Sequence, residues 1–283
     1  MRFARVGEAG RERPVVLDEA GKAYDISGLT ADIDGAFLAG DGPARAAAEL
    51  SAGSLTEVPL DGVRYGPPVA RPGKIVCIGL NYSDHAAETG SPTPGEPILF
   101  MKAPNVMVGP DDTVLIPRRS EKTDYEVELA IIIGKETSYL DSPEDADAVI
   151  AGYAIADDVS EREFQAERGG TWDKGKSCAT FLPLGPWLVT PDEVGDPQNL
   201  ALRTRVNGGI RQDGNTKNMI FGVRHLVWYI SQFMVLEPGD VIPTGTPAGV
   251  GFGNNDFPFL TAGDVVELEI DRLGRQRHTL AQA

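Results

Sequence analysis

Residues 125–133 read YEVELAIII and carry the clearest β-strand pattern in the chain. Because side chains of a strand alternate between its two faces, Val127 and Leu129 are predicted to share one face, with Glu126 and Glu128 side by side on the other. Two carboxylates beside so apolar a run repel each other and resist the loss of water. The pattern therefore predicts a neighbouring hard cation, or alternatively an edge strand whose glutamates face water.

A third acidic ligand is expected from a second strand, residues 152–158, which read GYAIADD. Asp158 ends this stretch after two small alanines, and Asp157 is the alternative. A set of carboxylate oxygens selects Mg²⁺, Mn²⁺ or Ca²⁺ over zinc, which prefers histidine and cysteine. No histidine lies at a metal-binding spacing; the three in the chain are His85, His225 and His278.

The remaining patterns predict several strands, few helices and one long loop. Further strands are expected at 2–6, 14–17, 74–79, 98–108, 113–116, 200–206 and 265–270, with Asn207-Gly208 as a hairpin turn. Helices are expected at 44–50, at 160–168 with Ser160 as N-cap, and along the apolar face formed by Ile220, Val223, Val227, Ile230 and Met234. Residues 241–253 are Gly/Pro-rich and are expected to form a loop. This mixture predicts an α+β, mainly β protein with a mixed or antiparallel sheet.

A boundary is predicted near Arg71, where Pro67, Pro68, Pro72 and Gly73 interrupt the chain. Residues 1–70 are expected to form a small N-terminal domain, and residues 71–283 the catalytic domain.

Composition narrows the class of protein. The chain has 283 residues, 41% of them hydrophobic, and a formal net charge of −16. This charge repels phosphate backbones, so nucleic acid is not an expected partner. No apolar run reaches membrane-spanning length, and the first residues do not resemble a signal peptide. The two cysteines, Cys77 and Cys178, match no paired motif. A cytoplasmic enzyme with reduced thiols and no membrane partner is expected.

Six segments resemble the fumarylacetoacetate hydrolase family and occur in the family's order. They are IVCIGLNYSDHAAE (75–88), FMKAPN (100–105), DYEVELAIIIG (124–134), GYAIADDVSERE (152–163), GKSCATFLPLGPW (175–187) and GDVIPTGTPAGVG (239–251). The stretch SEREFQAERGGTWDKGKSC further resembles a subset linked to hydrolysis of 2,4-dioxo-3-deoxy sugar acids, including 2,4-diketo-3-deoxy-L-fuconate, and often labelled ureidoglycolate lyase.

The resemblance implies a rolled mixed β-sandwich, usually dimeric, with Mg²⁺ or Mn²⁺ on Glu126, Glu128 and Asp158. It implies that His85 and Glu88 activate water. The residues agree, because one helical turn brings positions three apart together, and a carboxylate beside an imidazole raises its basicity.

Other positions match residues that contact substrate or stabilise charge in the family. Lys176 matches a lysine that stabilises negative charge near the ion. Ala179 departs from the family pattern, which usually has an acidic residue at that position. The expected substrate contacts are Arg162, Gln165 and Thr246, with Tyr82 and Lys102 as weaker candidates for the cavity wall.

The predicted function is hydrolysis of a C–C bond in a small anionic 2,4-dioxo acid, giving pyruvate or a related 2-oxo acid and a second acid. Two alternatives remain open on the sequence alone. One is decarboxylation of oxaloacetate, or tautomerisation or isomerisation of a 2-oxo acid, at the same metal site. The other is a non-catalytic metal-binding scaffold, toward which only Ala179 points.

Overall fold

The strand predicted from the two-glutamate pattern is β10, Val127–Ile133, which begins directly after Glu126, and all seven of its residues are buried. In the computed structural model, which describes residues 1–254 and 256–283, β10 pairs with β11 (Ile150–Asp157) on one side and β16 (Val241–Pro243) on the other. β10 is therefore a central strand, and the edge-strand alternative is wrong. Glu126 and Glu128 lie inside the protein.

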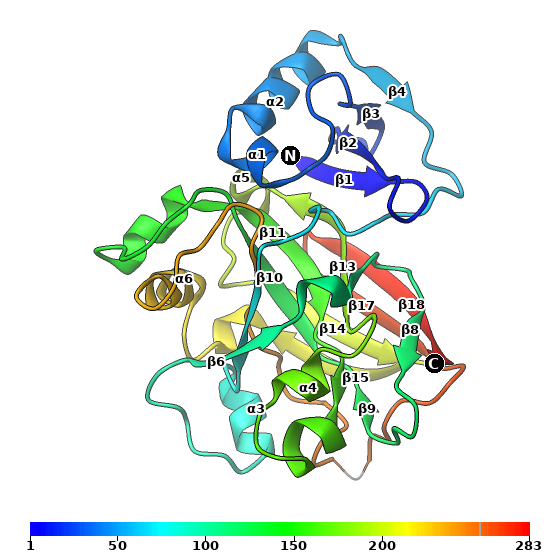
Figure 1. Ribbon diagram of the computed structural model, residues 1–283, viewed down its shortest axis with the longest axis vertical. Helices are drawn as coiled ribbons and strands as arrows, with labels where there is room; N and C mark the ends of the chain where they lie inside the picture. Colours follow the sequence, from blue (N-terminus) through cyan, green and yellow to red (C-terminus); the bar gives the residue numbers. More distant parts are fainter. Residues whose placement is uncertain (255) are drawn as a thin grey trace.

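The largest sheet extends from β10 in both directions (Figure 1). Next to β16 lie β5 and β6; next to β11 lie β13 and then the N-terminal strands in the order β1, β2, β3, β4. The β16–β5 and β13–β7 pairs are parallel, and the others are antiparallel, so the sheet is mixed as predicted. The bounds are β1 Arg2–Val6, β2 Arg13–Leu17, β3 Ala23–Asp25, β4 Thr56–Val58, β5 Ile75–Gly79, β6 Ile98–Lys102, β7 Met107–Val108 and β13 Leu182–Val189.

A second sheet packs against β10, β11 and β13 and closes the core. Its order is β15-β14-β17-β18-β8, with bounds β8 Val114–Ile116, β14 Ala201–Val206, β15 Gly209–Asn215, β17 Val265–Ile270 and β18 Gly274–Gln282. Asn207 and Gly208 turn between β14 and β15 with positive φ angles of 51° and 79°, so the predicted hairpin is confirmed. The short strands β9 (Thr123–Asp124) and β12 (Ser160–Glu161) form a separate pair.

The helices are short and lie outside the two sheets (Figure 1). They are α1 Gly35–Ala39, α2 Gly42–Ala52, α3 Ser83–Glu88, α4 Asp173–Lys176, α5 Pro191–Val194 and α6 Val223–Ser231, with 3-10 turns η1 Pro104–Val106, η2 Pro143–Ala148 and η4 Thr216–Asn218 and a π-helical turn, η3, Glu163–Glu167. The predicted face of α6 buries Val223, Val227 and Ile230. Within the described residues, no helix has both the length and the apolar character that crossing a bilayer demands.

Three local predictions are wrong. The single strand expected at 98–108 is divided into β6, η1 and β7. Ser160 does not cap a helix: Ser160 and Glu161 form β12, and helical structure is limited to η3. The reason is tertiary, because the Glu161 carboxylate accepts hydrogen bonds from Ser120 and Thr123 and holds this segment beside β9. The region after α6 is also not all loop, because residues 241–243 supply β16 between β5 and β10.

The first 70 residues contain β1 to β4 and helices α1 and α2, which lie together at the top of Figure 1. β1 pairs with β13 through Arg2↔Val189 and Phe3↔Leu188, so the largest sheet continues into this region without a break. The division at residue 70 into two domains remains a prediction.

Candidate active site

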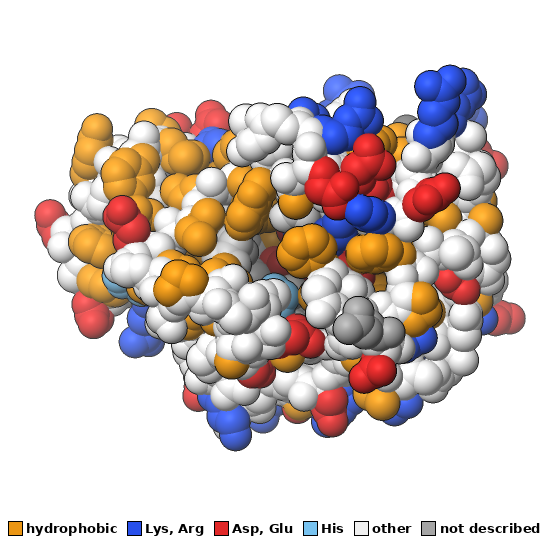
Figure 2. Space-filling view, turned by 90° about the horizontal axis from the view of Figure 1, so that it is seen from below, with side chains coloured by type: hydrophobic (Ala, Val, Ile, Leu, Met, Phe, Trp, Pro, Cys, Tyr) orange, Lys and Arg blue, Asp and Glu red, His pale blue; other side chains and the backbone are white. Residues whose placement is uncertain are grey.

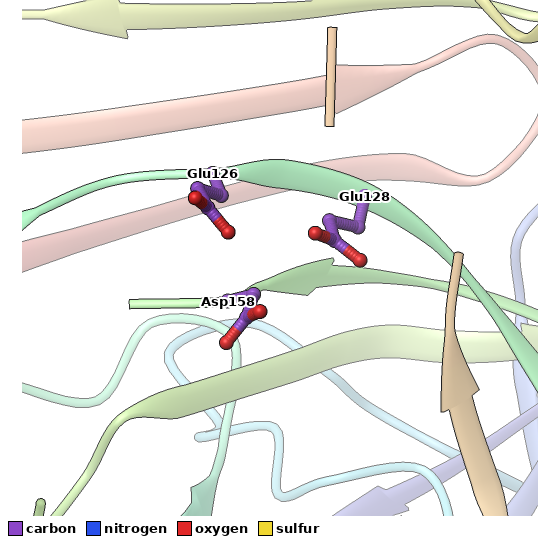
Figure 3. Close-up of side chains that lie close together, drawn as sticks. All are labelled: Glu126, Glu128 and Asp158. Carbon is purple, nitrogen blue, oxygen red and sulfur yellow. The ribbon is translucent and has the colours of Figure 1, made fainter. Parts of the chain in front are cut away.

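Three buried carboxylates meet where β10 and β11 lie side by side. Glu126 directly precedes β10, Glu128 is its second residue and Asp158 directly follows β11. The backbone N–H of Asp158 donates to the carbonyl oxygen of Glu126 at 3.0 Å, which holds the two segments together. One oxygen from each carboxylate lies within 4.8 Å of the others, and Figure 3 shows all three facing a common space. This all-oxygen donor set suits a hard divalent cation.

Two cationic side chains lie directly against these carboxylates. Nζ of Lys176 lies 2.7 Å from Oε2 of Glu126 and 2.8 Å from Oδ2 of Asp158. Nζ of Lys102 donates to Oδ1 of Asp158 and, at 3.0 Å, to the carbonyl oxygen of Val159. Lys102 therefore supports Asp158; it is not among the residues that line the cavity, and its place in the substrate site remains a prediction.

The carboxylates differ in their electrostatic setting. Burial opposes ionisation of Glu126, but the positive charges of Lys176 and Arg162 outweigh it and lower its pKa to about 2. Burial raises the pKa of Glu128 well above its usual value, and the nearby charges of Asp158 and Glu126 raise it further. A carboxylate so crowded by its neighbours is stabilised in its charged form by a bound cation. The residues therefore fit a divalent metal.

A cavity of about 220 Å³ opens above the carboxylates. Figure 2 shows this face of the molecule hollowed near its centre. Seven of the predicted site residues line the cavity: His85, Glu126, Glu128, Arg162, Gln165, Lys176 and Thr246. Its outer wall mixes apolar and hydroxyl side chains, namely Leu80, Ile98, Phe100, Trp172, Phe252, Thr89 and Ser91.

His85 and Glu88 lie on α3, at the side of this cavity. Nδ1 of His85 lies 3.2 Å from Oε2 of Glu88, as the spacing of three residues predicts. The Glu88 carboxylate also accepts the backbone N–H of Gly249 at 3.0 and 3.1 Å. Glu88 is thus fixed from two sides and can hold the imidazole in one orientation, with Nε2 free of this contact.

Arg162 is held by a residue that sequence reasoning did not single out. Its Nε donates to Oδ2 of Asp124 at 2.8 Å, and Nη1 donates to Oε1 of Gln165 at 3.0 Å. Nη2 lies 2.7 Å from Oε1 of Glu126. Asp124 also accepts the backbone N–H groups of Gly251 and Phe252. The only feature of the sequence that indicated a role for Asp124 was its position just before the two-glutamate strand.

Thr246 lies at the cavity floor and is held by the strand beneath it. Its hydroxyl donates to the carbonyl oxygen of Val127 at 2.9 Å and accepts a hydrogen bond from Gln212 at 2.7 Å. Gln212, which sequence reasoning missed, also accepts the N–H of Val127 at 3.1 Å. The sequence feature that could have indicated a role for Gln212 is that a glutamine stands at an inward-facing position of a hairpin strand.

Two further positions lie away from the cavity. Tyr82 is fully buried, its hydroxyl has no hydrogen-bond partner within residues 1–254 and 256–283, and it is not among the residues that line the cavity, so its role at the cavity wall remains a prediction. Its place at the start of α3 turns the ring into the core. Ala179 is exposed and also absent from the cavity lining, so its departure from the family pattern does not alter the cavity wall.

Comparisons with known proteins identify a family and similar relatives. Residues 74–281 match the family described as fumarylacetoacetate (FAA) hydrolase C-terminal. The chain is 47% identical over 283 residues to a 2,4-didehydro-3-deoxy-L-rhamnonate hydrolase of Sphingomonas sp. (strain SKA58), covering 100% of this chain and 96% of that protein.

Solved structures are similar along the whole chain. A fumarylacetoacetate hydrolase from Exiguobacterium antarcticum is 35% identical with a TM-score of 0.84, covering 100% of both chains. A maleylpyruvate hydrolase from Sphingobium sp. SYK-6, in complex with manganese (II) ion and pyruvate, is 31% identical with a TM-score of 0.83, again covering 100% of both chains. The carboxylate triad, the fold and these matches together show that the chain belongs to the fumarylacetoacetate hydrolase family.

Proposed function

We propose that this protein is a divalent-metal-dependent hydrolase that cleaves a C–C bond in a small 2,4-dioxo acid, giving pyruvate or a related 2-oxo acid and a second acid. The single observation that carries the proposal is that one cavity is lined by the imidazole of His85 and by two members of the carboxylate triad, Glu126 and Glu128. The Sphingomonas relative acts on a 2,4-dioxo deoxy sugar acid by its name, which supports a sugar acid of this class as substrate.

Glu126, Glu128 and Asp158 would hold the metal, which we propose to be Mg²⁺ or Mn²⁺. The manganese in the maleylpyruvate hydrolase structure supports a divalent ion of this kind. When bound, such an ion supplies Lewis-acid polarisation of substrate oxygens and offsets developing negative charge. Together with Arg162 and Lys176 it gives a local positive field in a chain whose net charge is −16.

The chain's own residues perform the proton transfer and the charge stabilisation. His85 removes a proton from water while Glu88 fixes the imidazole through Nδ1. The resulting hydroxide attacks the carbonyl carbon at position 4 of the substrate. The bond between carbons 3 and 4 then breaks, and its electron pair leaves with carbon 3 as the enolate of the 2-oxo acid. Carbon 4 keeps the hydroxyl group and becomes the second carboxylic acid. Lys176 stabilises the negative charge of the enolate, and delivery to carbon 3 of the proton that His85 took from water completes the 2-oxo acid.

Arg162, Gln165 and Thr246 would contact the substrate. All three line the cavity, and the fixed guanidinium of Arg162 offers an oriented cation to a carboxylate group. Because Asp124 and Gln165 hold this side chain before substrate enters, little side-chain entropy is lost on binding.

We also propose that the protein works in the cytoplasm as a homodimer. Neither Cys77 nor Cys178 forms a disulfide, as is usual in a reducing compartment. Tyr139 is 73% exposed and Phe233 is 62% exposed, and exposed apolar side chains of this size are typical of subunit interfaces. In Figure 2, hydrophobic side chains gather on the left, the side that carries α6 in Figure 1. Size-exclusion chromatography with light scattering tests the dimer.

The proposed reaction is tested with a panel of 2,4-dioxo acids, including deoxy sugar acids, in the presence of Mg²⁺ or Mn²⁺. Equal amounts of 2-oxo acid and a second carboxylic acid are expected, and both products should disappear in Glu126→Ala and His85→Ala. Release of CO₂ would instead indicate decarboxylation, and a rearranged substrate would indicate isomerisation. Product formation that survives in both variants would overturn the mechanism.

A further inference from the structure

We infer that Asp157 and His278 form a positioning pair that fixes Glu126 for metal binding. Asp157 is the last residue of β11 and directly precedes Asp158 of the triad. Its Oδ1 accepts the backbone N–H of Glu126 at 2.9 Å, and its Oδ2 lies 3.0 Å from Nε2 of His278. Asp157 and His278 are at most 1% exposed. The inference rests on the proposed metal-binding role of Glu126.

The two consecutive aspartates hold the backbone of Glu126. This residue lies just before β10, whose pairing with β11 begins at Val127↔Asp157. A carboxylate oxygen of Asp157 accepts a hydrogen bond from the backbone N–H of Glu126. The carbonyl oxygen of Glu126 accepts one from the backbone N–H of Asp158. Both polar groups of the Glu126 backbone are therefore held by the two consecutive aspartates, one through its side chain and one through its main chain. The position of this ligand depends on the orientation of the Asp157 carboxylate.

The imidazole of His278 orients that carboxylate. His278 lies on β18 of the other sheet, paired with Val266. An ionised carboxylate only accepts hydrogen bonds, so Nε2 of His278 is the donor in this contact. Nδ1 is buried and has no partner within the described residues. Burying an imidazole with one unpaired nitrogen costs free energy, which an apolar side chain at this core position would avoid. The histidine offsets this cost through its hydrogen bond to Asp157.

Together these contacts connect the C-terminal strand to the metal site across the interface between the two sheets. Neighbouring groups that orient metal ligands commonly change metal affinity by about ten- to a hundredfold when they are removed. Asp157 and His278 touch neither the cavity nor the proposed substrate, because neither lines the cavity. They therefore act through Glu126.

The test compares His278→Gln with His278→Asn. The two amides have the same chemistry, but only glutamine is long enough to place a nitrogen near the position of Nε2. Binding of Mn²⁺ is measured on metal-free protein by electron paramagnetic resonance of the free and bound ion. His278→Gln should bind Mn²⁺ within about threefold of wild type, whereas His278→Asn should bind about ten- to a hundredfold more weakly, with an altered spectrum of the bound ion.

A matched control separates positioning from general loss of stability. Leu280 is buried on the same face of β18, and Leu280→Ala should lower the unfolding temperature without changing Mn²⁺ affinity. If His278→Asn does not fold, His278→Leu takes its place with the same expected loss of affinity. Equal Mn²⁺ affinity in wild type, His278→Asn and His278→Leu would overturn the inference and leave the proposed function intact. Failure of wild type to bind Mn²⁺ at all would overturn both.

Discussion

The ammonium group of Lys176 lies 2.7 Å from the Glu126 carboxylate, at a place where both side chains are almost completely buried. The same ammonium group reaches Asp158 at 2.8 Å. One positive charge thus bridges two of the three carboxylates, while its remaining surface faces the cavity. In a setting with little water, such a fixed charge interacts strongly with negative charge that develops on a substrate.

Replacing this lysine should therefore slow the chemical step. Lys176→Met is expected to lower kcat by about 10²- to 10³-fold, because the side chain keeps its length and loses its charge. Steady-state kinetics with saturating metal measures the effect. Lys174→Met is the matched control, since Lys174 lies two residues away on the same short helix and is exposed. A kcat for Lys176→Met close to that of the control would contradict the assigned role.

Glu128→Gln should weaken metal binding and at the same time stabilise the metal-free protein. The pKa of Glu128 is raised by burial and by the charges of Asp158 and Glu126. A carboxyl group whose pKa is higher in the folded than in the unfolded chain lowers stability as the pH rises above the unfolded value of about 4.3. The neutral amide removes this penalty and can still accept the N–H of Gly245, which lies 2.7 Å from Oε2.

Metal-free Glu128→Gln is therefore expected to unfold at a higher temperature than metal-free wild type, by a larger margin at about pH 7 than at about pH 5. Its Mn²⁺ affinity should fall about tenfold or more, because a charged ligand is lost. Calorimetry in the presence of a chelator measures the first effect. If metal-free Glu128→Gln were less stable than metal-free wild type at about pH 7, repulsion among the carboxylates would not be what destabilises this site.

The histidine–glutamate pair predicts graded losses of activity. His85→Ala removes the proposed base and should lower kcat by about 10²- to 10⁴-fold. Glu88→Gln keeps a side chain beside the imidazole but removes its charge, so a smaller loss is expected. His225→Ala serves as control, because His225 lines a separate cavity between α6 and η2. If His85→Ala kept full activity on the substrate that the wild-type protein cleaves, His85 would be excluded as the base.

In the loop that follows β16, substitution of Gly249 should be harmful, whereas substitution of Gly253 should be tolerated. A Cβ atom at Gly249 would lie 2.1 Å from the carbonyl oxygen of Arg211, whereas one at Gly253 meets nothing within 4 Å. Both residues have positive φ angles, of 107° and 77°. Gly253→Ala should cost only the roughly 1–2 kcal/mol of a left-handed conformation.

Gly249→Ala should cost more stability and also lower kcat, because the displaced backbone no longer donates its N–H to Glu88. Thermal unfolding and kinetics on the two variants provide the comparison. Equal losses of stability and activity at both positions would argue that the contact between this loop and Glu88 has no role in catalysis.

Several features could be predicted from the sequence because their signal is local. The alternation in β10, the apolar spacing of α6 and the Asn207-Gly208 turn each depend on neighbours along the chain. The convergence of Glu126, Glu128 and Asp158 was also predictable, since two adjacent strands with acidic residues at corresponding ends bring them together.

Other features depend on contacts that no local pattern encodes. The helix expected from Ser160 is replaced by β12, because Glu161 bonds to residues about forty positions earlier. Asp157 was weighed as a metal ligand, but the pairing of β10 and β11 turns it toward His278, 121 positions away. The roles of Asp124 and Gln212 likewise depend on how distant segments pack, which composition and periodicity do not reveal.

The pairing of β1 with β13 has a practical consequence for anyone shortening this protein. A fragment that starts near residue 71 would keep every residue of the cavity but would lose the strand that covers Leu188 and Val189. The backbone there would become an open edge, and open edges recruit strands from other molecules. We expect such a fragment to self-associate during expression, and adding back residues 1–17 as a separate peptide should suppress that self-association.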